Sequence, residues 1–101
     1  MNRRRAILSG HSGDYKLAIS LLNDKDAKVR GAALSSLEKL GKLSRKILEK
    51  SFCDASPEVR KRAIELLVKR PEEIPLNAFD DEDSLVVETA CWAAGEKENQ
   101  T

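Results

Sequence analysis

The stretch DAKVRGAAL, from Asp26 to Leu34, returns 30 residues later as SPEVRKRAI, from Ser56 to Ile64. Val, Arg and Ala stand at the same offsets in both stretches, and a weaker third copy follows after another 27 residues. In longer form the three copies are DKDAKVRGAALSSL from Asp24, DASPEVRKRAIELL from Asp54 and DEDSLVVETACWAA from Asp81. Self-similarity at a period of about 20 to 50 residues is typical of repeat proteins, in which each copy is one small structural unit.

The repeated stretch has the pattern of an amphipathic helix that follows the shared Asp. One arc of the first copy's helix carries Val29, Ala33, Leu37 and Leu40, and the opposite arc carries Gly31, Ser35, Glu38 and Lys39. In the middle copy Ser56 can cap the helix, Pro57 suits its first position and Glu58 complements its dipole. Asp26 and Asp83 occupy the same capping position in the other two copies.

A further helix is predicted before each shared Asp, over residues 14–22, 43–52 and 72–79. We call this the first helix of a copy and the amphipathic helix after the Asp the second helix. Pro71 and Pro75 should shorten the third copy's first helix, because proline lacks the N–H that a helix interior needs.

A helix pair of this length buries one face within itself and leaves another face that needs a neighbour, so successive pairs stack. The predicted fold is therefore all-α, a single α-α superhelix over residues 1–101. It is divided into a half-repeat at 2–10, three repeats at about 14–41, 42–70 and 71–96, and a polar tail at 97–101. The half-repeat rests on Arg3, Ala6 and Ile7, which precede Arg30, Ala33 and Leu34 by 27 residues.

Composition agrees with a helical protein, since 41% of the residues are apolar, 35% are charged and only 4% are aromatic. No apolar run reaches the roughly 18 residues of a membrane helix, and we expect a cytoplasmic protein that does not contact a membrane. Residues 1–70 hold 17 Lys or Arg against 8 Asp or Glu, whereas residues 71–101 hold 1 against 9. Such asymmetry favours either solvated helix faces or head-to-tail contact between copies of the protein.

The motif D-x-D/S-x-x-V-R-x-x-A-x-x-x-L resembles the HEAT repeat, in particular the short subtype named for phycobilisome lyases. ETACWAAGE, from Glu88 to Glu96, is similar to the second helix of the same subtype, and the resemblance spans about residues 14–96. It implies a helical solenoid and, most often, a surface that binds another protein. The family also includes lyases with chaperone-like relatives, and related repeats build DNA glycosylases, so these two functions stay as alternatives.

The resemblance also implies a ladder in which the Asp of each turn pairs with the Arg of a second helix. Its members here would be Asp24, Asp54 and Asp81 with Arg30 and Arg60. A third rung is missing because Val87 occupies the Arg position. We therefore assign Arg30 and Arg60 to the structure rather than to a ligand-binding surface.

The sequence does not place the groups that catalysis or metal binding needs next to one another. His11 is the only histidine and lies between two glycines, and the acidic run at 80–83 lacks the pattern of a calcium loop. Cys91 aligns with Leu34 and Ile64, which predicts a core residue, while Cys53 falls in a turn. We expect no enzyme activity, no metal and no cofactor.

The predicted binding residues lie opposite the apolar arc, on the side that lines the concave surface of a HEAT stack. They are Lys61, Arg62, Glu65, Lys69 and Trp92. Trp92 allows two interpretations, an anchor for a partner or a ring packed between repeats. The sequence predicts a protein-binding scaffold with an acidic partner, and the lack of interleaved aromatic residues argues against nucleic acid.

The side of the last pair beyond Gly95 has no predicted helix to cover it, because the chain continues as EKENQT. A second copy, a different partner or further repeats could fill this position. We expect weak self-association through this end.

Overall fold

The computed structural model describes residues 15–99, which contain five α-helices, two 3₁₀ helices and no strand. The elements are α2 (Tyr15–Leu21), α3 (Ala27–Lys39), α4 (Arg45–Ser51), α5 (Pro57–Leu66), η1 (Leu67–Lys69), η2 (Leu76–Asp80) and α6 (Ser84–Glu98). The all-α prediction is confirmed. The half-repeat predicted at 2–10, the arginines at 3–5 and His11 lie outside the described residues.

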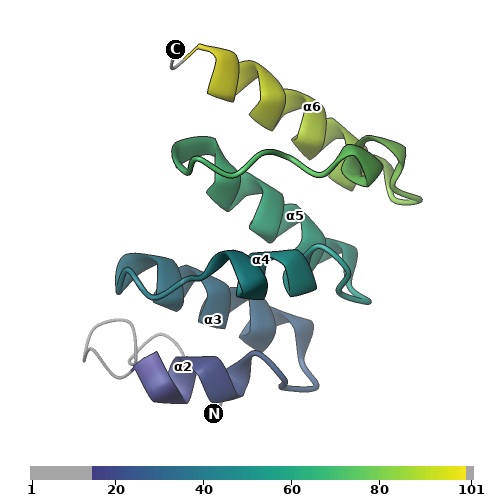
Figure 1. Cartoon of the computed structure of the whole chain (residues 1–101). Coiled ribbons are helices and arrows are strands. Elements are labelled where there is room, and N and C mark those ends of the chain that lie inside the picture. Colours follow the sequence, from purple (N-terminus) through teal and green to yellow (C-terminus); the bar gives the residue numbers. More distant parts are fainter. Residues whose placement is uncertain (1–14, 100–101) are drawn as a thin grey trace.

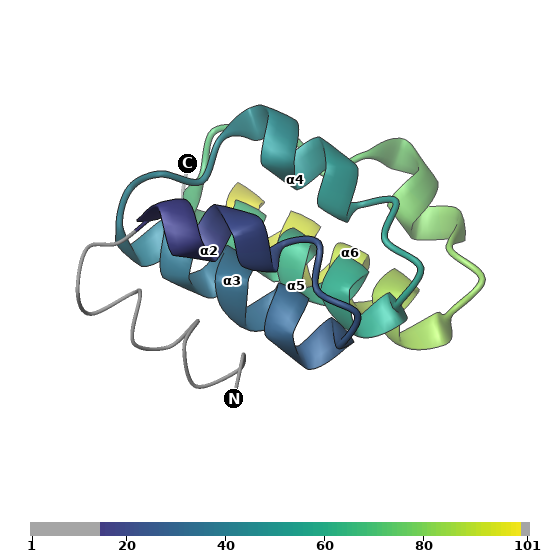
Figure 2. The ribbon, with the colours of Figure 1, turned by 90° about the horizontal axis from the view of Figure 1, so that it is seen from below.

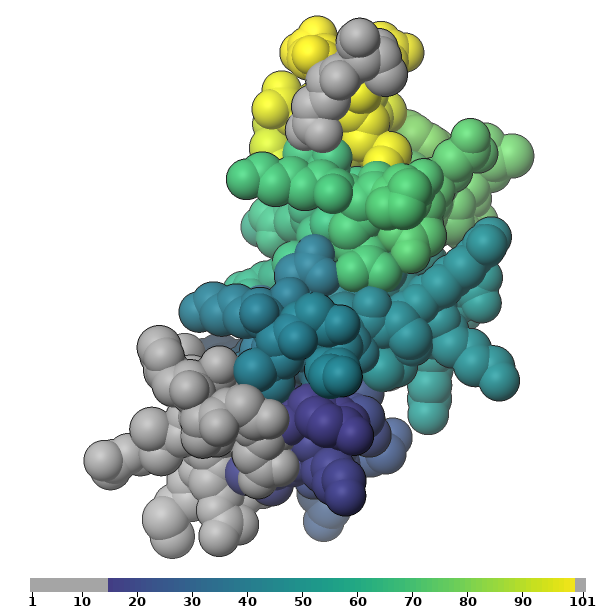
Figure 3. Space-filling model, turned by 60° about the vertical axis from the view of Figure 1, so that its left-hand side comes forward, coloured from purple at the N-terminus to yellow at the C-terminus, as the bar shows by residue number. Residues whose placement is uncertain are grey.

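The helices stack in two rows (Figure 1). The second helices α3, α5 and α6 form one row and contact each other in turn, whereas α2, α4 and η2 lie on the other side of this row (Figure 2). Consecutive segments form successive bands along the stack (Figure 3). Within the described residues α2 does not contact α4, and α4 does not contact η2. The row of second helices is therefore the continuous spine of the solenoid.

Short polar side chains start the helices where the sequence places them. The carboxylates of Asp26 and Asp83 accept hydrogen bonds from the backbone N–H groups of Lys28 and Leu85, respectively. The Ser44 hydroxyl does the same for Ile47 at α4. Ser56 holds the N-cap position of α5, but its side chain makes no capping hydrogen bond. The prediction of a Ser56 side-chain cap was wrong.

The end of α3 is fixed by Gly41, whose φ of 69° places it in the left-handed region. Its N–H donates to the Glu38 carbonyl, and the N–H of Lys42 donates to the Leu37 carbonyl at 2.8 Å. This pair of bonds is the Schellman motif, which favours glycine because a Cβ is strained at positive φ.

The third copy lacks a full first helix. Residues 71–75 are irregular between Pro71 and Pro75, and only the short 3₁₀ helix η2 follows before the shared Asp81. Each proline also restrains the residue before it to an extended conformation, which Arg70 adopts with φ −117° and ψ 156°. The two prolines explain why the helix predicted over 72–79 is reduced to η2.

The apolar core runs between copies as well as within them. Val29, Val59 and Val86, aligned by the repeat, are all buried. Leu34 packs in one cluster with Val59 and Ala63 of α5, and Ile64 packs with Val86, Ala90 and Ala93 of α6. Gly31, which the sequence places on the outward arc of α3, is buried instead, so that part of the prediction was wrong.

Cys91 is exposed, and its predicted place in the core was wrong. It aligns with Leu34 and Ile64, each of which faces the second helix of the following copy. No described helix follows α6, so the equivalent position is open to solvent. Cys53 is exposed as well.

This difference predicts unequal costs of truncation at equivalent positions. Ile64→Ala should lower the free energy of unfolding by about 2 to 4 kcal/mol, because it opens a cavity between α5 and α6. Cys91→Ala should change it by less than about 0.5 kcal/mol. Urea unfolding followed by circular dichroism measures both, and equal losses would contradict an open position at Cys91.

Candidate functional site

Two arginines connect consecutive turns of the stack through paired hydrogen bonds. The Arg30 guanidinium donates to both carboxylate oxygens of Asp54 at 2.9 Å, and Arg60 donates to those of Asp81 at 2.9 and 3.0 Å. The remaining terminal nitrogen of each arginine donates to the turn before its own helix. Arg30 contacts the Asp24 carbonyl at 2.8 Å, and Arg60 contacts the Asp54 carbonyl at 2.7 Å. Each guanidinium therefore bridges its own turn to the next one.

The carboxylates of this ladder also order their own turns. Oδ1 of Asp24, Asp54 and Asp81 accepts the backbone N–H two residues later in each case, at 2.8 to 2.9 Å. Asp83, from the same acidic run as Asp81, caps α6. These two members of the run thus have structural contacts.

Ion pairing shifts the ionisation of the ladder carboxylates. Burial of Asp54 disfavours its charged form, but hydrogen bonds from Arg30 and from the Ser56 N–H outweigh it and lower the pKa below 3.8. At Asp81 the hydrogen bonds from Arg60 are the largest cause of a lowered pKa, with burial opposing them. Both carboxylates therefore stabilise the fold in their charged form.

The ladder should make stability depend on acidity. A carboxylate with a lowered pKa contributes stability that is present above its unfolded pKa, near 3.8, and is lost as the pH falls through the lower folded value. Asp81→Asn should cost about 2 kcal/mol at pH 7, and this difference from the wild type should shrink below pH 3.8. Urea unfolding at several pH values tests this, with Asp80→Asn as a control at a neighbouring exposed carboxylate. A difference that does not change with pH would contradict it.

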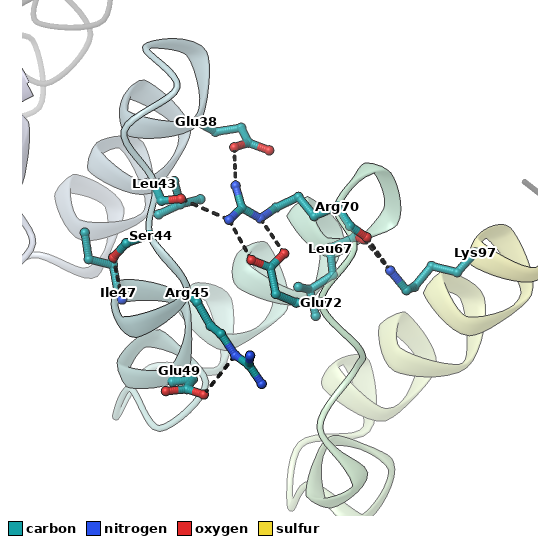
Figure 4. A network of polar contacts seen from close by, with 10 residues as sticks. All are labelled: Glu38, Leu43, Ser44, Arg45, Ile47, Glu49, Leu67, Arg70, Glu72 and Lys97. Carbon is teal, nitrogen blue, oxygen red and sulfur yellow. Dashed lines mark hydrogen bonds and ion pairs between the residues drawn. The ribbon is translucent and has the colours of Figure 1, made fainter.

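A second polar network joins the other ends of the second helices and was not predicted from the sequence (Figure 4). Arg70 donates to the Glu38 carboxylate at 2.8 Å, to both Glu72 oxygens at 2.9 and 3.0 Å, and to the Leu43 carbonyl at 3.0 Å. Lys97 of α6 donates to the carbonyls of Leu67 and Arg70 at 2.9 and 2.7 Å. The hydrogen bonds from Arg70 lower the pKa of Glu72, against the effect of burial.

The repeat contained a signal for this network. Arg70 and Lys97 are 27 residues apart and thus occupy equivalent positions, at the ends of the second and third copies' second helices. Each cation reaches back to backbone carbonyls of the preceding copy. The first copy has Leu40 at this position, so the pattern has two members in the described copies.

Arginine geometry is central to this network. Arg70→Lys should lower the free energy of unfolding by about 1 to 2 kcal/mol, because an ammonium group cannot contact Glu38, Glu72 and the Leu43 carbonyl together. Arg45→Lys, in an exposed pair with Glu49, is the matched control and should have no measurable effect. Equal effects of the two variants in urea unfolding would contradict a special role for Arg70.

The binding residues predicted on α5 lie on the face of the second-helix row that points away from α4. Lys61 is half-buried, Arg62 is exposed and contacts the Ser35 hydroxyl, and Glu65 lies 3.8 Å from Arg62. Lys61, Arg62 and Glu65 line an open groove that also includes Asp83 and Leu85 near the start of α6. Lys69 is exposed in η1, past the end of α5, and is not among the residues that line the groove.

Two large apolar side chains of α6 are exposed. Trp92 is 52% exposed and Leu85 is 58% exposed. They are seven residues apart, which places them on one side of the helix about 10.5 Å from each other along its axis. The sequence analysis missed Leu85, although a leucine aligned with Lys28 and Glu58 of the other copies was a signal. We call Leu85, Trp92 and the groove residues Lys61, Arg62 and Glu65 the inner face.

The described residues hold no group of three or more His, Cys, Asp or Glu side chains that could bind a metal ion. Every buried side-chain nitrogen or oxygen in this part of the chain has a hydrogen-bond partner. No helix between residues 15 and 99 has the length and apolarity to cross a membrane.

Comparison with known families gives two matches along the chain. The family described as HEAT repeat matches residues 15–44, and the family described as HEAT repeat associated with sister chromatid cohesion matches residues 45–67. Neither curated proteins nor solved structures gave a match.

Proposed function

Because the chain carries HEAT repeats over residues 15–67, and such repeats typically serve as scaffolds for protein interaction, we propose that it binds a partner protein through the inner face. HEAT repeat modules are usually non-catalytic, and no catalytic domain is identified in this chain. The function proposed is that of a non-enzymatic binding module. The assignment to the short subtype named for phycobilisome lyases stays a prediction from the sequence.

The observation that carries this proposal is the pair of exposed apolar side chains on α6. Tryptophan is among the residues that contribute most to protein interfaces, because its large ring loses much water-exposed area on binding. Leu85 adds a second apolar contact beside the groove that connects α5 and α6. The helix holds both side chains in a fixed arrangement, so little conformational entropy is lost when a partner binds.

Charges around these anchors support an acidic partner. Lys61 and Lys69 have no ion-pair partner within the described residues, whereas Arg62 is partly neutralised by Glu65. A carboxylate of the partner could thus contact the two lysines at the edge of the apolar contact. Such rim charges guide association and specificity more than they add affinity.

Nucleic-acid binding, the alternative from the sequence, finds less support. Arg30, Arg60 and Arg70 are each engaged with carboxylates inside the stack and do not offer their guanidinium groups to phosphates. Self-association through the open side of α6 stays a prediction.

The proposed interface can be tested by truncating its two anchors. Proteins captured from a source-cell extract by the immobilised chain should be reduced at least tenfold when Trp92→Ala and Leu85→Ser are combined, because both anchors are lost. Quantitative mass spectrometry measures this reduction. Ile19→Ser, at an exposed apolar residue of α2, is the control and should capture the same proteins as the wild type. Capture that is insensitive to the double variant would contradict the proposed inner face.

A further inference from the structure

A second groove lies on the other row of the stack, between α4 and the irregular segment before η2. We call it the outer groove and define it by Leu48, Glu49, Phe52, Glu73, Ile74 and Leu76. It is open to solvent and has a volume of about 630 Å³. It shares no residue with the inner face.

The outer groove exists because the third copy lacks a full first helix. The chain runs irregularly from Pro71 to Pro75, and η2 begins only at Leu76, without contact to α4. The space beside α4 that a full helix would fill is therefore left open. The two prolines build this opening into the sequence, since neither would fit in a helix interior.

The lining of the outer groove is suited to an apolar side chain. Leu48 is buried at 1% exposure, while Phe52 and Ile74 are half-buried. Leu76 is 85% exposed, the highest value among the large apolar side chains of the described residues. Covering these side chains would remove apolar surface from water, which favours binding in proportion to the area covered.

The backbone beside the groove offers hydrogen bonds as well. Within the described residues no protein group bonds to the N–H or the C=O of Glu73 or Ile74. Ile74 precedes a proline, which favours an extended conformation. An extended chain with free donors and acceptors can pair with a second extended chain, as in peptide recognition by strand addition.

Charge around the groove favours a cation in the bound segment. Glu73 is exposed and has no ion-pair partner within the described residues, and the side chain of Glu49 is 61% exposed. Glu49 lies 3.5 Å from Arg45, an exposed pair of little strength. Glu72 is already bound by Arg70. The carboxylates at the rim thus exceed the nearby cations.

We propose that the outer groove binds an extended, basic and apolar segment of a partner protein. The segment pairs with the backbone of Glu73 and Ile74 and places an apolar side chain against Phe52 and Leu76. An adjacent Lys or Arg contacts Glu73 and Glu49. This site is separate from the inner face and does not depend on the function proposed there.

The test uses a phage-displayed library of random 12-residue peptides selected on the full chain. Selected peptides should carry an apolar residue next to Lys or Arg, and Leu76→Asp should weaken their binding at least tenfold. Glu73→Lys should weaken it about threefold to tenfold, with a steeper loss at low salt. Leu85→Asp, at an exposed leucine of the inner face, is the matched control and should leave binding unchanged. Circular dichroism checks that the variants stay folded.

Backbone pairing has its own measurement. N-methylation of the peptide amides beside the apolar residue should weaken binding about threefold to tenfold for each amide that pairs, because each loses one hydrogen bond. Methylation of amides at the peptide ends serves as the control.

Three outcomes would overturn the proposal: selection that enriches no peptide, enriched peptides that ignore Leu76→Asp and Glu73→Lys, or enriched peptides rich in acidic residues. Peptides that lose binding to Leu85→Asp and not to Leu76→Asp would assign recognition to the inner face. That last result would support the proposed function and reject the outer groove.

Discussion

The bidentate bridge between an arginine of one second helix and the aspartate of the following turn is the contact on which the stack depends. Arg30 with Asp54 and Arg60 with Asp81 are both largely buried, with the side chains 10 to 17% exposed. Each bridge fixes the distance and rotation from one copy to the next, and an unpaired charge left in this position would be costly. The apolar contacts of Leu34 and Ile64 then fill the space that the bridges define.

The two rows of the stack follow from this arrangement. The second helices are held together by the ladder at one end and by Arg70 and Lys97 at the other, so they form a closely packed spine. The first helices have no such bridges and do not contact one another within the described residues. Side chains on the spine are therefore held in place for binding, while the opposite row has grooves between its elements.

The third copy departs most from the repeat, and both proposed sites involve it. Val87 replaces the ladder arginine, two prolines replace most of the first helix, and Leu85 and Trp92 stand where the middle copy has Glu58 and Glu65. A residue that breaks a structural pattern without a structural gain is a candidate for function. In this copy the departures create two exposed apolar anchors and an open groove.

The sequence by itself determined the helix pairs and their stacking, because spacing of apolar residues, caps and prolines acts over a few residues and repeats at a fixed interval. It also indicated where Leu85 and the cations at 70 and 97 break or follow the pattern, although these signals were not used. Only the tertiary structure decided the burial of Gly31, the exposure of Cys91 and the contacts of Arg70. The physical reason is that burial depends on which neighbour packs against a position. Equivalent residues of successive copies have the same local sequence pattern but different neighbours.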